Sequence, residues 1–188
     1  GETVEAVVYE ERSTYARAVM VTAVSPSPER VEPPCPHVGR GCGGCGWQHI
    51  SPSGQVELKA AVVTEALRRL GGVSAPTVVL GPALATSAYR TSLRLGVVDG
   101  RPGFRRRRRH DGVVVDGGLV AHPLLAEVLV TGDFGDATEA VLRCGARTGQ
   151  RLCVLTPTAA GADLGPGVRA VGSDELAAGR RRSLRISM

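Results

Sequence analysis

The segment CPHVGRGCGGCGWQH, residues 35–49, constrains this chain most strongly because it holds three of the five cysteines. Cys42 and Cys45 form a Cys-x-x-Cys pair, and the two glycines between them allow a tight turn that points both sulfurs at one centre. Cys35 precedes this pair by six intervening residues. Three thiolates at this spacing suit zinc or an iron–sulfur cluster. Two alternatives are weaker: a thioredoxin-like redox pair, which lacks its βαβ surroundings here, and reduced thiols that bind nothing.

The charge of the chain favours an anionic partner, though only weakly. The formal net charge is +5 and the sequence pI is about 9.3, as expected of a protein that binds nucleic acid. Lys59 is the only lysine, so part of the arginine signal reflects base composition of the gene. No apolar segment is long enough to cross a bilayer and no signal peptide is visible. We therefore expect a cytoplasmic protein with no membrane partner, whose cysteines bind metal or lie buried rather than form disulfides.

Hydrophobic patterning predicts an α+β protein. Alternation predicts strands near 4–10 and 15–24, and the proline-rich stretch 25–34 predicts an extended linker. Ser51 as N-cap and Pro52 at the first helical position predict a helix that ends before Gly71. The apolar stripe of this helix has five members: Val56, Ala60, Val63, Leu67 and Leu70.

From Tyr89 onward the pattern is β again. Strands are predicted at 89–98 and 104–115, joined by an extended turn at 99–103 that contains the turn signal Asp99-Gly100. Residues 123–130 are predicted to form a short helix. A second hairpin spans 139–157; if Thr148-Gly149 is a two-residue loop, Cys144 faces Cys153.

Arginines gather on the first of these hairpins, and we expect them to contact RNA. Arg90 and Arg94 are predicted on its first strand and the run 105–109 on its second, where alternate side chains share a face that can follow a phosphate backbone. The plainer alternative is an edge strand protected by charge. The predicted RNA-binding residues are Arg90, Arg94, Arg105, Arg107 and Arg109.

The cysteine loop resembles the iron–sulfur loop of the RNA (uracil-C5)-methyltransferase family, in which CGGC is followed by a Gln-His pair. The resemblance extends along nearly all of the chain. It implies a partial OB-like TRAM β-barrel followed by a mixed α/β central domain with an antiparallel sheet. The implied domains are 1–30 (the C-terminal half of TRAM and its linker), 31–51 (the iron–sulfur loop), 52–180 (the central RNA-binding domain) and 181–188 (the start of a link to an absent methyltransferase domain).

The resemblance also implies a [4Fe–4S] cluster, with Cys35, Cys42 and Cys45 as three of its four ligands. The fourth cysteine of the family falls at Gly118, so the cluster is expected to be incomplete, to be replaced by zinc, or to recruit another ligand. His122 is the predicted substitute. Cys144 and Cys153 are less suitable because the hairpin makes them core thiols.

The catalytic domain that binds S-adenosylmethionine in this family has no counterpart in the sequence, which shows no glycine-rich strand–turn–helix followed by an acidic residue. No catalytic or cofactor-binding residue is therefore predicted. We expect the RNA-recognition and iron–sulfur portion of a methyltransferase acting on rRNA or tRNA, with S-adenosylmethionine bound only if a downstream domain exists. The alternatives are a stand-alone metal-binding RNA-binding module and a redox carrier, although ferredoxin-like carriers have more complete cysteine sets.

Overall fold

The structure is a computed structural model that describes residues 1–107 and 111–179. The chain divides into two compact units. The N-terminal unit comprises 1–33 and 47–81, and the sheet unit comprises 34–46 and 82–188. Helices and both antiparallel and parallel strand pairs are present, which confirms the α+β class. Arg109 and the predicted link 181–188 lie outside the described residues. No helix of the described part is long and apolar enough to span a membrane.

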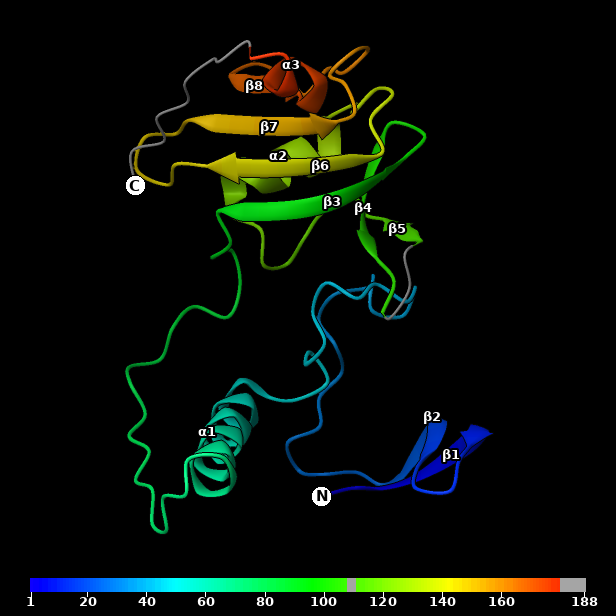
Figure 1. Ribbon diagram of the computed structural model, residues 1–188, viewed down its shortest axis with the longest axis vertical. Helices are drawn as coiled ribbons and strands as arrows, with labels where there is room; N and C mark the ends of the chain where they lie inside the picture. Colours follow the sequence, from blue (N-terminus) through cyan, green and yellow to red (C-terminus); the bar gives the residue numbers. More distant parts are fainter. Residues whose placement is uncertain (108–110, 180–188) are drawn as a thin grey trace. The chain divides into compact units, whose positions relative to one another are not determined.

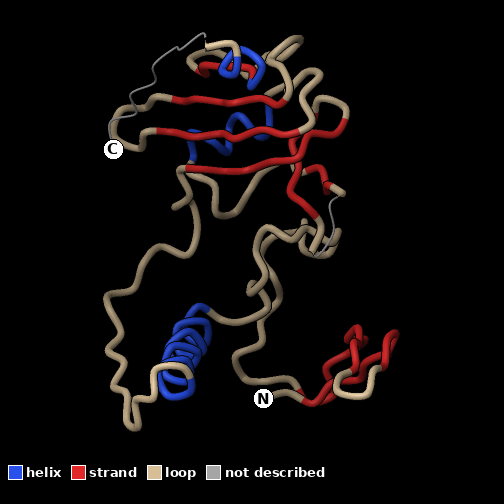
Figure 2. The backbone as a smooth tube through the Cα atoms, viewed as in Figure 1, coloured by secondary structure: helices blue, strands red, loops and turns tan. Residues whose placement is uncertain are grey.

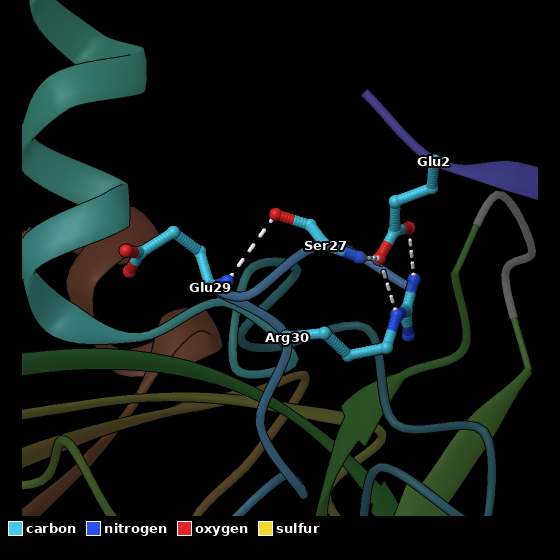
Figure 3. Close-up of polar contacts among 4 residues, drawn as sticks. All are labelled: Glu2, Ser27, Glu29 and Arg30. Carbon is cyan, nitrogen blue, oxygen red and sulfur yellow. Dashed lines mark hydrogen bonds and ion pairs between the residues drawn. The ribbon is translucent and has the colours of Figure 1, made fainter. Parts of the chain in front are cut away.

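The first element of the N-terminal unit is a β-hairpin. β1 (Thr3–Glu11) pairs antiparallel with β2 (Ala16–Ser25), and the two form a sheet of their own. Both strands lie where the sequence predicts them and are rich in valine and alanine. At the open end of the hairpin, Glu2 receives hydrogen bonds from the backbone of Ser27 at 3.0 Å and from Arg30 Nε at 2.6 Å (Figure 3). These contacts fasten the proline-rich linker to the start of β1.

The second element of this unit is the helix α1 (Pro52–Arg69). The Ser51 hydroxyl accepts a hydrogen bond from the Gly54 amide at 3.0 Å, which satisfies one of the free amides of the first turn. The predicted N-cap is therefore confirmed. The predicted apolar stripe is present but exposed: Val63 retains 48% of its accessible surface and Leu67 39%. Gly54 is the one fully buried residue of the N-terminal unit.

The sheet unit is built on six strands in the order β5-β4-β3-β6-β7-β8 (Figure 1). Neighbouring strands are antiparallel except β7 and β8, which are parallel. The strands are β3 (Ser92–Val98), β4 (Arg101–Arg105), β5 (Gly112–Val114), β6 (Glu139–Cys144), β7 (Arg151–Thr156) and β8 (Val168–Gly172).

The turn between β3 and β4 lies at the predicted Asp99-Gly100 signal but is shorter than the extended turn 99–103 that the sequence predicts, because β4 already begins at Arg101. Val98 pairs with Arg101, and the two residues between them have positive φ, 49° at Asp99 and 71° at Gly100. These are the angles of a type I′ turn, whose twist matches that of the flanking strands.

The predicted register of the β6–β7 hairpin is wrong. Leu142 pairs with Cys153, and Cys144 pairs with Arg151 rather than with Cys153. The cause is a longer loop: the Gly145 amide donates to the Gln150 carbonyl at 2.9 Å, so the loop residues are 146–149. The pairing is displaced by two residues, which preserves the side-chain faces because strands have a period of two.

The hydrophobic core lies between the sheet and the helix α2 (Pro123–Thr131). Leu125, Val128 and Leu129 of this helix pack in one buried cluster with Leu93 and Leu142 of the sheet. Figure 2 shows α2 behind the strands, and the short helix α3 (Ser173–Ala177) follows β8. Residues that alternate with the buried ones on β3 and β6 therefore point to the opposite face.

Candidate metal loop and arginine face

The cysteine loop 34–46 belongs to the sheet unit, where it joins the end of β4. The Gly43 amide donates to the Arg105 carbonyl at 2.9 Å, and Cys42 forms an isolated antiparallel bridge with Arg106. The Arg106 guanidinium donates in turn to the Arg40 carbonyl at 2.8 Å. The loop and the arginine run, which lie far apart in the sequence, are therefore bonded backbone to backbone.

His37 lies buried at the centre of this loop, with 5% of its surface exposed. Its Nδ1 is 3.3 Å from Cys35 Sγ, and its Nε2 is 2.6 Å from Asp116 Oδ1. Arg40 approaches the same carboxylate oxygen at 3.5 Å. The hydrogen bond from His37 is the main cause that lowers the pKa of Asp116. The sequence analysis did not single out either His37 or Asp116.

The three loop cysteines are half-buried and influence one another. Burial is the main cause that raises the pKa of the Cys42 thiol, and the charges of Cys35 and Cys45 raise it further. The Gly44 amide, 3.5 Å from the Cys42 sulfur, lowers it. In the described part of the chain, no group of three or more His, Cys, Asp or Glu side chains is gathered closely enough to hold a metal ion. The assignment of these cysteines to a metal therefore stays a prediction.

Position 118 does lie near the loop, although it carries no ligand. A Cβ placed on Gly118 would be 3.8 Å from Phe104 Cε2, and one placed on Gly44 would be 3.4 Å from Phe104 Cγ. Both backbones thus approach the same aromatic ring. Because the residue at 118 is glycine, this position offers no side chain that could bind a metal.

His122 is the N-cap of α2, where its Nδ1 accepts a hydrogen bond from the Leu124 amide at 3.3 Å. Capping engages the ring nitrogen closest to the backbone, so the local role of this histidine is structural. Cys144 and Cys153 lie in the core as the hairpin pattern predicts, at 5% and 0% exposure. Burial raises the pKa of Cys153 to about 12.

The arginine run does not form the single strand that we predicted. β4 ends at Arg105, and Arg107 lies in a turn. The strand stops there because the loop takes over the next backbone positions through the Cys42–Arg106 bridge. Two of the side chains are engaged in ion pairs, Arg105 with Glu139 at 2.5 Å and Arg106 with Asp111 at 2.9 Å. Alternation along one strand therefore cannot align Arg105 with Arg107.

A different set of arginines does share a face. Leu93 and Leu95 point to the core, so Arg94 between them points away from α2; Leu142 and Cys144 place Arg143 on that same side of β6. We call the set Arg94, Arg101, Arg105 and Arg143 the arginine face. Within the described residues, Arg94, Arg101 and Arg143 form no ion pair, and all three are exposed. Arg90, just before β3, is exposed too.

Sequence reasoning missed Arg101 and Arg143. The signal for Arg143 was present, since it alternates with the apolar residues of a predicted strand. A contiguous arginine run is a strong local charge signal, whereas isolated arginines on neighbouring strands are brought together only by the fold.

The fold is that of a known class of RNA-modifying enzymes. The structure is similar to the solved tRNA (uracil-54, C5)-methyltransferase of Pyrococcus abyssi in complex with S-adenosyl-L-homocysteine, with a TM-score of 0.52 and 23% identity. The likeness covers 79% of this chain and 37% of that one. At this identity it establishes the fold alone.

Sequence comparison adds bacterial relatives. The chain is 38% identical over 164 residues to an uncharacterized RNA methyltransferase of Streptomyces coelicolor, covering 79% of this chain and 35% of the relative. It is 48% identical over 98 residues to the 23S rRNA (uracil(1939)-C(5))-methyltransferase RlmD of Alkalilimnicola ehrlichii, covering 52% and 22%. No family model matches the chain. The chain belongs to the RNA (uracil-C5)-methyltransferase family and spans about a third or less of the length of these two relatives.

Proposed function

We propose that this chain is the RNA-recognising portion of an RNA (uracil-C5)-methyltransferase that acts on rRNA or tRNA. Family membership supports the reaction class, in which S-adenosylmethionine donates the methyl group. The domain boundaries, the TRAM assignment of 1–30 and the cytoplasmic location stay predictions.

The observation that carries the proposal is the arginine face. Three exposed arginines without ion pairs to described residues lie on neighbouring strands of one sheet. Strands in a sheet are about 5 Å apart, a spacing at which arginines on adjacent strands can contact successive phosphates of an extended strand. If all three neutralise a phosphate of single-stranded RNA, the slope of log K against log salt is about −2.

Binding of a uridine-containing single-stranded RNA, measured by fluorescence anisotropy across a salt series, tests the proposal. Replacing Arg94 and Arg143 by alanine should bring the slope from about −2 to about −0.7, because two of the three contacts are lost. The matched control replaces Arg68 and Arg69 of α1, which removes the same charge from a helix whose ion pairs are with Glu65. An equal loss in both double variants would show that total charge, and not the arginine face, determines binding.

The enzyme class is tested separately, with the complete protein that contains this chain. Methyl transfer to C5 of uridine displaces the C5 proton, so RNA tritiated at that carbon should release tritium in proportion to methyl incorporation. Methyl transfer without tritium release would place the reaction elsewhere on the RNA and overturn the uracil-C5 assignment.

We further propose that the cysteine loop binds a metal centre that holds the end of β4 in place. The support is the bonding of the loop to Arg105 and Arg106 and the mutual influence of the three thiols. Metal analysis of protein prepared without oxygen tests this role. Metal-free protein, after growth with zinc and iron supplied, would refute it.

A further inference from the structure

We propose that His37 is the fourth ligand of a mononuclear zinc ion held by Cys35, Cys42 and Cys45, and that Asp116 positions its imidazole. The inference rests on the proposed metal-binding role of the loop. It adds the missing ligand, the residue that orients it, and the identity of the metal.

The spacing of Cys35 and His37 is the first argument. Around tetrahedral zinc, bonds of about 2.3 Å to sulfur and about 2.0 Å to nitrogen place these two ligand atoms about 3.5 Å apart. Cys35 Sγ and His37 Nδ1 are 3.3 Å apart. In a cubane cluster each protein ligand binds a different corner iron, which holds ligand atoms much further apart. The pair therefore fits a single ion.

The contact between His37 and Asp116 is the second argument. The carboxylate at 2.6 Å accepts the Nε2 proton, which leaves the lone pair on Nδ1 directed at the Cys35 thiol. Histidines that bind zinc in proteins nearly always donate their other nitrogen to a carboxylate, a carbonyl or a water in this way. His37 is also buried, so its orientation is fixed by the fold rather than by solvent.

The backbone of the loop provides the third argument. The Cys42 amide donates to the His37 carbonyl at 3.0 Å, so the Cys-x-x-Cys turn starts directly beside the histidine. The Gly44 amide points at Cys42 Sγ at 3.5 Å, where it would stabilise a thiolate. To complete the site, the sulfurs of Cys42 and Cys45 must close on the Cys35–His37 pair. In the described part of the chain these donors are not yet gathered closely enough to hold an ion.

The other candidate ligand already has a different task. His122 caps α2 with its Nδ1, and to bind metal through that nitrogen it would have to give up the cap. The loop contains four zinc-type donors within eleven positions, so position 118 is not needed. A Cys₃His donor set is a common structural zinc site.

Zinc and iron content per chain, and zinc K-edge X-ray absorption, test the inference on the whole chain. The wild-type protein should hold one zinc bound by three sulfurs and one nitrogen. His37→Ala should lose the zinc, whereas His37→Cys should retain it with four sulfurs in the spectrum. Asp116→Asn should weaken zinc binding by about 10- to 100-fold. His122→Ala is the matched control and should keep one zinc.

Each failure has its own signature. Zinc retained by His37→Ala but lost by Cys42→Ser would overturn the role of His37 while leaving the loop as the metal site. Zinc retained by Cys42→Ser would refute the metal-binding role of the loop itself. Iron and sulfide with absorbance near 400 nm would identify a cluster and reject mononuclear zinc. The melting temperature of each variant shows whether it is still folded. Zinc bound by four sulfurs in His37→Cys would show that position 37 supplies a ligand.

Discussion

Gly43→Ala should detach the cysteine loop from β4. A Cβ at this position would lie 2.8 Å from the Arg105 carbonyl oxygen, 2.9 Å from the Arg107 amide nitrogen and 3.0 Å from the Arg107 Cα. All three are backbone atoms, so no side chain can rotate to relieve the contact. Overpacking of this kind costs about 1–3 kcal/mol. The contact would strain the hydrogen bond from the amide of residue 43 to the Arg105 carbonyl.

The loss should be local and can be measured by hydrogen exchange of the metal-free protein. A cost of about 1–3 kcal/mol corresponds to exchange about 5- to 150-fold faster at amide 43, since 1.4 kcal/mol is tenfold. Gly46→Ala is the matched control, because a Cβ there meets nothing within 4 Å. Equal exchange at amide 43 in both variants would refute the reasoning that backbone contact at Gly43 fixes the loop.

Three further predictions concern the core and the ion pairs. Leu142 is fully buried, so Leu142→Ala should lower the free energy of unfolding, measured in denaturant titrations, by about 2–5 kcal/mol. Val130 is exposed, so the control Val130→Ala should change it by less than about 0.5 kcal/mol. Similar losses in both variants would contradict the assigned core. Because burial raises the pKa of Cys153 to about 12, folded, metal-free protein at pH 8 should be alkylated there more slowly than at the loop cysteines, as measured by mass spectrometry. Equal rates would contradict its burial. Hydrogen bonds from Arg30 and Ser27 lower the pKa of Glu2 to about 2. The stability that this contact contributes should therefore be complete above pH 4.5 and lost as the pH falls through about 2. If an NMR titration gives the same Glu2 pKa after Arg30→Ala, the ion pair is not the cause of the lowered pKa.

Elements determined by local chemistry were predicted well from the sequence. The start of α1 follows from a serine cap and a proline, and the turn between β3 and β4 follows from Asp99-Gly100, whose residues tolerate positive φ. In both cases the deciding atoms lie within four residues of each other. No information from distant parts of the chain was required.

Errors arose where a distant segment intervened. The end of β4 is set by the cysteine loop, which takes the Arg105 carbonyl and pairs with Arg106 from more than sixty positions away. The register of β6 and β7 failed for a nearer reason, since Gly145 and Gln150 close a loop two residues longer than the turn signal at Thr148-Gly149 suggests.

The His37–Asp116 pair shows most clearly what the sequence alone cannot predict. The two residues are 79 positions apart, and no pattern in the sequence connects them. His37 itself was within reach of sequence reasoning, because it stands two residues after a predicted metal-binding cysteine. In the sequence, His37 is much closer to the loop cysteines than His122, the predicted fourth ligand.

The β1–β2 hairpin has a practical consequence for work with this chain. Both faces are exposed: on the two strands and their turn, eight valine, tyrosine or methionine side chains retain 47% or more of their surface. The sheet has only these two strands, so each has one edge without a partner strand among the described residues. A lone two-stranded ribbon is marginally stable in water, and open edges invite pairing between molecules. In concentrated samples the hairpin is therefore where oligomers should nucleate, and a lysine introduced in place of Val7 or Val19 should delay their appearance.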